Sequence, residues 1–152
     1  MNANGTVKTV RDIMQTDIVT VTLKDNIYEI ALKMKQHDIG FIPVVEGKQL
    51  LGVVTDRDLV VRGYAEKHSG STAVKEVMSD QQVVSVPPTT PVDEAARLMA
   101  KNQIRRLPIV ENNELVGVVA IGDLAVRSKL EEEAGHALSE ISEKHKQSIG
   151  HN

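Results

Sequence analysis

A tandem repeat is the feature that most constrains the fold of this chain. Residues 19–62 match residues 84–127 at a constant offset of 65 positions, without a gap. The identical pairs run through the whole repeat: Val19/Val84, Val21/Val86, Glu29/Glu94, Ala31/Ala96, Met34/Met99, Ile39/Ile104, Pro43/Pro108, Val45/Val110, Glu46/Glu111, Leu50/Leu115, Gly52/Gly117, Val53/Val118, Val54/Val119, Asp58/Asp123, Leu59/Leu124, Val61/Val126 and Arg62/Arg127. Upstream, a Val-x-x-Ile-Met segment at Val10 returns as Val-x-x-Val-Met at Val74. The sequence therefore predicts two similar units, one beginning near residue 9 and the other near residue 73.

Each repeat also predicts the same order of helices and strands. Apolar residues at i, i+3, i+4 and i+7 indicate one amphipathic helix per repeat: Ile27, Ile30, Ala31 and Met34, then Val92, Ala95, Ala96 and Met99. Asp25 and Thr90 stand where an N-cap is expected, and Pro91 suits a first helical position.

Short β-branched runs around turn residues predict a hairpin after each helix, at 41–54 and 107–119. Further helices are expected from about Asp56 and Ile121, and short strands at 19–21 and 84–86. Each unit then has the order helix, β, α, β, β, α. Because so small a unit buries itself poorly, we expect an α+β fold in which the two units pack sheet to sheet as one pseudo-twofold module.

The composition excludes several kinds of site and partner. The 152 residues include no cysteine, which excludes disulfides and thiolate chemistry and fits a cytoplasmic protein. A net charge of −3 and only three aromatic residues make nucleic-acid binding an unfavoured hypothesis. No apolar run approaches the roughly 20 residues of a membrane span, and the start is unlike a signal peptide, so we expect no membrane association.

Three motifs, doubled in the same order, carry a resemblance to a known family. They are the opening Val-x-x-Ile-Met and its copy, the segment Arg105-Arg106-Leu107-Pro108, and the segment from Gly52 to Asp58 with its looser copy from Gly117 to Asp123. Together they resemble a tandem pair of cystathionine-β-synthase (CBS) domains, also called a Bateman module. The likeness covers roughly residues 8–128, with CBS domain 1 at 8–65, a linker at 66–72, CBS domain 2 at 73–128, and a polar helix or tail at 129–152.

The resemblance implies a regulatory module rather than an enzyme. Such modules bind AMP, ADP, ATP or related adenosyl ligands and pass their occupancy to a partner protein, with no required cofactor. It also implies a homodimer that pairs through its helices. The regulated protein is not indicated by the sequence.

Asp58 and Asp123 are the best candidates for ligand contact. Thr55 and Asp58 have the spacing of a capping box, which gives both a purely structural explanation. Ala120 cannot cap by its side chain, and yet Asp123 stands at the matching place. In the family the matching carboxylate binds ribose, while exposed amides and the Thr hydroxyl hold phosphate or ribose.

The resemblance implies two clefts, each joining parts of both repeats. Site A would join one turn to the first strand and pre-strand segment of the second repeat, with the arginines reaching phosphate; its residues are Thr55, Arg57, Asp58, Val84, Ser85, Arg105, Arg106 and Pro108. Site B would be its twin, formed by Ala120, Ile121, Asp123, Val19, Thr20, Gly40, Phe41 and Pro43. Site B lacks the Thr and the paired arginines, so we expect it to be empty or to take a less charged ligand.

Other interpretations of these residues stay open. Arg105 and Arg106 alone are typical of an exposed surface pair, and the repeats could serve only as a ligand-free scaffold for protein interaction. The triplet Asp56-Arg57-Asp58 offers few oxygen ligands at one turn and has no calcium-loop spacing, so no metal site is expected. An enzyme is disfavoured because no nucleophile and base can be paired.

Overall fold

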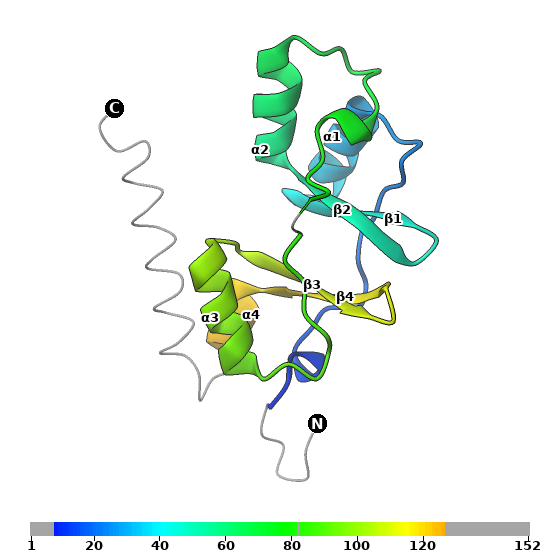
Figure 1. Ribbon diagram of the computed structural model, residues 1–152. Helices are drawn as coiled ribbons and strands as arrows, with labels where there is room; N and C mark the ends of the chain where they lie inside the picture. Colours follow the sequence, from blue (N-terminus) through cyan, green and yellow to red (C-terminus); the bar gives the residue numbers. More distant parts are fainter. Residues whose placement is uncertain (1–7, 82, 127–152) are drawn as a thin grey trace, which may run out of the picture. The chain divides into compact units, whose positions relative to one another are not determined.

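The computed structural model describes residues 8–81 and 83–126, which fall into two compact units (Figure 1). The first unit contains the described residues from 18 to 83, together with 112–115. The second unit contains residues 8–17, 84–111 and 116–126. Both units combine helices with hairpin strands, which confirms the α+β class. The packing of one sheet against the other stays a prediction.

The first unit contains a hairpin, two helical segments and two short 3-10 turns, at Tyr64–Glu66 and Val74–Glu76. Its elements are α1 (Ile27–His37), β1 (Phe41–Glu46), β2 (Gln49–Thr55) and α2 (Asp56–Asp58), which continues as a π-helical turn at Leu59–Gly63. β1 and β2 pair antiparallel, from Phe41 opposite Thr55 to Glu46 opposite Gln49. Gly47, at the hairpin turn, has a φ of 60°, a conformation that glycine adopts without strain.

The second repeat has the same arrangement, although its residues 112–115 are grouped with the first unit. It contains α3 (Val92–Asn102), β3 (Arg106–Glu111), β4 (Glu114–Ala120) and α4 (Ile121–Val126). The turn between its strands is formed by Asn112 and Asn113, which both have positive φ, as a tight hairpin turn requires. The two hairpins predicted from the β-branched runs are therefore confirmed.

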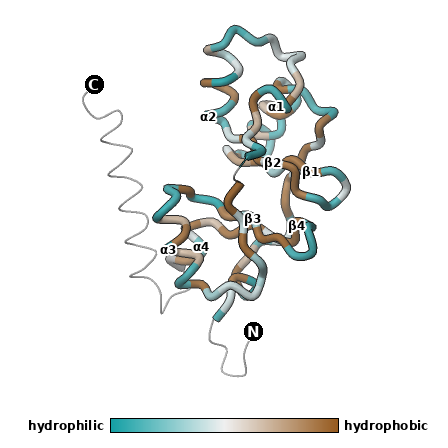
Figure 2. Tube along the Cα trace, in the orientation of Figure 1, coloured by the Kyte–Doolittle hydropathy of each residue, from teal (hydrophilic) through white to brown (hydrophobic). Residues whose placement is uncertain are grey.

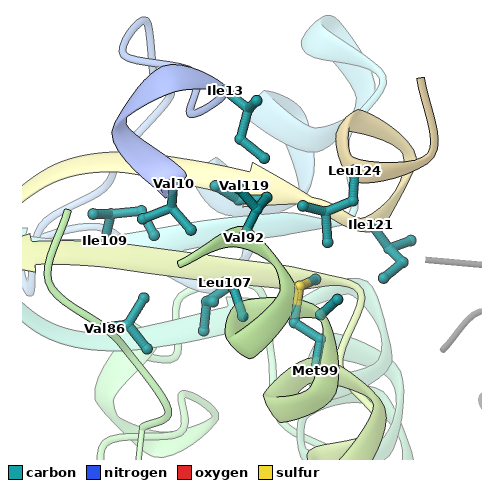
Figure 3. Packing of buried hydrophobic residues seen from close by; sticks show 12 residues of the cluster. Val10, Ile13, Val86, Val92, Met99, Leu107, Ile109, Val119, Ile121 and Leu124 are labelled. Carbon is teal, nitrogen blue, oxygen red and sulfur yellow. The ribbon is translucent and has the colours of Figure 1, made fainter. Parts of the chain in front are cut away.

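Each unit has its own hydrophobic core, in which helix side chains pack on the strands. Figure 2 shows hydrophobic stretches in the strands of both units and hydrophilic stretches in the turns. Figure 3 shows the core of the second unit, where Met99 of α3 and Leu107 of β3 are fully buried. The first unit matches it with Ile30 of α1 and Ile42 of β1.

The short segment that opens each repeat packs in the core of the other repeat's unit. Val10, which begins the 3-10 turn at Val10–Asp12, and Ile13, which follows that turn, belong to the core of the second unit (Figure 3). Val74 and Val77 belong to the core of the first. The boundaries 8–65 and 73–128 thus describe the sequence repeats, whereas the compact units exchange their opening segments.

Backbone bridges fix these exchanged segments at the strand edges. Gln15 and Val118 exchange two hydrogen bonds of 2.9 and 3.0 Å, and Ser79 and Val53 exchange two of 2.8 and 2.9 Å. The predicted linker 66–72 is likewise part of the first unit, because the carbonyl of Thr72 accepts from Ile27 N–H at 2.9 Å.

The predicted helix starts were wrong by one residue. Asn26 rather than Asp25 caps α1, and the Asp25 carboxylate instead accepts from Thr22 N–H. Pro91 is the N-cap of α3 and not its first residue, since the Thr90 hydroxyl donates to the Pro87 carbonyl in the preceding turn.

The short strands at 19–21 and 84–86 are reduced to single bridges, between Val21 and Val44 and between Val86 and Ile109. The tail predicted at 129–152 lies outside the described residues. Across the described part of the chain, no helix has both the length and the apolar character needed to cross a membrane.

Candidate functional site

The turn from β2 into α2 is a complete capping box. The Thr55 hydroxyl accepts from Asp58 N–H at 3.1 Å, and Asp58 Oδ2 accepts from Thr55 N–H at 2.9 Å. Both residues are half-buried, and Arg57 between them is exposed. The capping interpretation of this pair is therefore confirmed, so any contact of Asp58 with a ligand would be additional to its structural role.

The turn from β4 into α4 keeps half of the same box. Asp123 Oδ2 accepts from Ala120 N–H at 3.1 Å and from Gln15 Nε2 at 3.4 Å. A backbone N–H is enough for this bond, so the missing hydroxyl at Ala120 does not deprive Asp123 of a structural role. Capping therefore explains Asp123 as well, contrary to what the alanine at position 120 suggests.

In each unit this turn lies directly against the segment that precedes the hairpin. Asp56 N–H donates to the Gly40 carbonyl at 3.0 Å, and Ile121 N–H donates to the Arg105 carbonyl at 3.0 Å. The structure thus brings each carboxylate turn next to the pre-strand segment of its own repeat. The combination of parts from different repeats, as sites A and B require, stays a prediction.

The segments predicted to face adenine lie beside the first hairpin strands. Val86 N–H donates to the Pro108 carbonyl at 3.3 Å, and Val21 N–H donates to the Pro43 carbonyl at 3.1 Å. Both prolines are buried, while the remaining candidate residues of these segments are half-buried or exposed; these are Val19, Thr20, Phe41, Val84 and Ser85.

The arginines of the candidate sites are exposed. Arg106 Nη1 donates to the Arg105 carbonyl at 3.2 Å, which places its guanidinium over the pre-strand backbone. Within residues 8–81 and 83–126, the side-chain ion pairs are Arg11 with Glu111 and Arg97 with Asp93. The guanidinium charges of Arg57, Arg105 and Arg106 are thus not neutralised by any described carboxylate.

Two side chains at these surfaces were not predicted as site residues. Asp56 places its carboxylate over Gly40, because a Cβ on that glycine would lie 2.8 Å from Asp56 Oδ2. Lys33 Nζ donates to the Thr20 carbonyl at 2.9 Å. Neither contact has a signal in the spacing of the sequence, since both depend on how the chain returns on itself.

The described residues contain no group of three or more His, Asp or Glu side chains able to hold a metal ion. A shallow hollow lies at the hairpin turns, lined by residues 46, 48–49 and 112–114, and none of the predicted site residues lines it.

Comparison with known proteins identifies the family of this chain. The family model described as CBS domain matches residues 10–63 and 74–128. The CBS domain-containing protein YhcV of Bacillus subtilis is 50% identical over 133 residues, which cover 88% of this chain and 94% of YhcV.

Two solved structures show the same architecture. Hypoxic Response Protein I, with two coordinated zinc ions, superposes with a TM-score of 0.72 at 30% identity, covering 79% of this chain and 98% of that protein. The CBS domain pair of protein MJ0100, in complex with 5′-methylthioadenosine and S-adenosyl-L-methionine, gives 0.68 at 26% identity, covering 78% and 97%. The chain belongs to the CBS-domain family and carries a tandem pair of CBS domains.

Proposed function

We propose that this chain is a regulatory module that binds an adenine nucleotide or adenosyl ligand and signals its occupancy to a partner protein. The observation that carries the proposal is the repeated carboxylate at Asp58 and Asp123. In both, one oxygen (Oδ2) accepts from a backbone N–H within the turn. Among the described residues, Oδ1 of neither carboxylate has a hydrogen-bond partner, so each can accept from a ribose hydroxyl.

The family supports the chemical class of this ligand. MJ0100, a relative by fold and sequence, holds two adenosyl compounds in its CBS pair. In this proposal, sites A and B join the carboxylate turn of one repeat to the pre-strand segment of the other, with the backbone at 19–20 and 84–85 facing adenine. A ligand-sensing role without catalysis, in the cytoplasm, completes the proposal; cell fractionation checks the location.

The exposed arginines support a phosphorylated ligand at site A. Arg105 and Arg106 present two exposed guanidinium groups that pair with no described carboxylate, and arginine is suited to bidentate phosphate contacts. A phosphate contact by these arginines distinguishes the proposal from its main alternative, a ligand-free interaction scaffold, in which the arginines are only solvated surface residues.

Thermal shift with adenosine, AMP, ADP and ATP tests the proposal. A ligand at about one hundred times its Kd adds about 2.7 kcal/mol to the free energy of unfolding, which gives a clear rise in Tm. Substituting Arg105→Ala together with Arg106→Ala is expected to lower the affinity for AMP about tenfold or more, because each charge-assisted hydrogen bond contributes about 1.5–3 kcal/mol. The affinity for adenosine should change less than about twofold.

Two results contradict this expectation. No shift with any of the four compounds supports the ligand-free scaffold. Equal losses of affinity for AMP and adenosine in the double variant exclude a phosphate role for the arginines. If added salt reduces the rise in Tm with AMP but not the rise with adenosine, the phosphate role of the arginines is supported.

We also propose that the protein is a homodimer. The first unit exposes several large apolar side chains on and near its helical segments, among them Tyr28 at 59%, Val60 at 59% and Tyr64 at 84% exposure. Exposed apolar groups that gather on one unit are typical of an interaction surface. Light scattering at micromolar concentration should give twice the 16.6 kDa chain mass, and a monomer mass would contradict the homodimer.

A further inference from the structure

We propose that Asp56 excludes phosphate from the Gly40 side of the first unit, so that the ligand bound there is an adenosyl group with a neutral or cationic 5′ substituent. The inference rests on the proposed function, and it names the ligand class of site B. It makes Asp56 a residue that determines specificity, at a position for which the sequence predicted no ligand role.

The Asp56 carboxylate lies on the face of Gly40 that a side chain would otherwise occupy. A Cβ built on Gly40 would lie 2.8 Å from Oδ2 and 3.3 Å from Oδ1 of Asp56. Two backbone bonds define this position. Asp56 N–H donates to the Gly40 carbonyl at 3.0 Å, and Arg57 N–H donates to Asp56 Oδ1 at 2.8 Å. The negative charge thus lies over the pre-strand backbone.

The matching positions of the second unit have the opposite chemistry. Arg105 replaces Gly40 in the repeat, and Ile121 replaces Asp56. Ile121 is only 4% exposed and packs in the core, while Arg105 is exposed. The pre-strand segment of the second repeat therefore presents a cation, Arg105. The same segment of the first repeat presents an anion, because Asp56 from the turn after β2 covers Gly40.

The other charged groups on this surface do not cancel Asp56. Asp56 forms no ion pair with Arg57 or with any other described cation. Lys33 Nζ, the cation observed on the neighbouring segment, donates to the Thr20 carbonyl. A phosphate brought to Gly40 would meet the Asp56 carboxylate first and be repelled, whereas a thioether or a sulfonium would not.

The test measures local affinity by NMR, through the backbone amides of Gly40 and Phe41. Adenosine and AMP are titrated into the full chain, and the ratio of their Kd values is compared between variants. Asp56→Asn removes the charge at nearly constant size. Gly40→Ala keeps the charge but pushes the carboxylate away, and for this variant only the Phe41 amide is read. Glu66→Gln, an exposed carboxylate of the same unit, is the matched control.

In the wild type, these amides should report tighter binding of adenosine than of AMP. Asp56→Asn and Gly40→Ala should each lower the ratio of the Kd for AMP to the Kd for adenosine by about three- to tenfold, a range expected for one charge screened by solvent. Glu66→Gln should leave the ratio within about twofold of wild type.

Three results would overturn the inference. If adenosine binds and Asp56→Asn leaves the ratio unchanged, the inference fails while the proposed function stands. If these amides report equal Kd values for AMP and adenosine in the wild type, the inference also fails while the proposed function stands. If neither compound shifts the amides in any variant, the inference fails together with the proposal that this surface binds an adenosyl ligand.

Discussion

Replacing Val10 by alanine should loosen the unit that contains the second repeat and leave the first repeat's own unit unaffected. Val10 is fully buried in a cluster with α3 and the strands that follow it. Loss of two buried methyl groups, with the cavity left behind, costs about 2 kcal/mol. Amide exchange in α3 and β3 should therefore accelerate by roughly 30-fold under native conditions.

The repeat supplies a matched variant with the opposite outcome. Val74 is the counterpart of Val10 and is fully buried in the core of the first unit. Val74→Ala should accelerate exchange in α1 and β1 and spare α3. Thr89→Ala serves as the control, because Thr89 is exposed and its truncation should change the free energy of unfolding by less than about 0.5 kcal/mol. Faster exchange of α1 in Val10→Ala would contradict the exchanged arrangement.

The sequence could not predict which unit receives each opening segment. Val10 and Val74 begin nearly the same pattern, and each core offers a similar apolar surface to it. Hydrophobic spacing specifies that the segment is buried, but it does not specify which of the two similar cores buries it. That choice is made by long-range contacts, such as Gln15 with Val118 and Ser79 with Val53.

The helices and hairpins could be predicted because their signals are local. The apolar stripe of α1 and the Gly47 turn both act within a few residues. The error at the helix start has the same origin, since Asp25 and Asn26 are both good caps. A competing bond from Thr22 N–H to the Asp25 carboxylate decides between them.

The candidate site was predictable only in part. The repeat places Asp58 and Asp123 at equivalent turns, and both carboxylates are held there. The position of Asp56 over Gly40 joins residues 16 positions apart through the hairpin. Such a contact follows from the register of β1 on β2, in which Phe41 lies opposite Thr55, and no single motif encodes it.

Substituting Asp58→Ala is expected to weaken binding of a phosphorylated adenosine by about tenfold or more. The proposal assigns Asp58 Oδ1 to a ribose hydroxyl, and a hydrogen bond to a charged group contributes about 1.5–3 kcal/mol. Asp123→Ala should reduce the same affinity much less, because site B lacks the paired arginines. Titration calorimetry on each variant measures the two losses.

Loss of the capping box must be separated from loss of the ligand contact. Asp58 also accepts from Thr55 N–H at 2.9 Å, so Asp58→Ala should lower the free energy of unfolding by about 1 kcal/mol even without a ligand. Glu29→Ala is the matched control. Glu29 forms the equivalent box with Asn26 at the start of α1, where its Oε1 accepts from Asn26 N–H at 3.0 Å.

Asp58→Ala and Glu29→Ala should lower the free energy of unfolding by similar amounts, but only Asp58→Ala should lower the affinity for the nucleotide. Circular dichroism first establishes that each variant is folded at the titration temperature. If Glu29→Ala retains wild-type affinity while Asp58→Ala loses about tenfold, the carboxylate contacts the ligand as well as the backbone. If both retain it, Asp58 only caps a helix. If Asp123→Ala abolishes nucleotide binding and Asp58→Ala does not, the stronger site is the one that contains Asp123, and the charge of Arg105 and Arg106 does not determine which cleft binds phosphate.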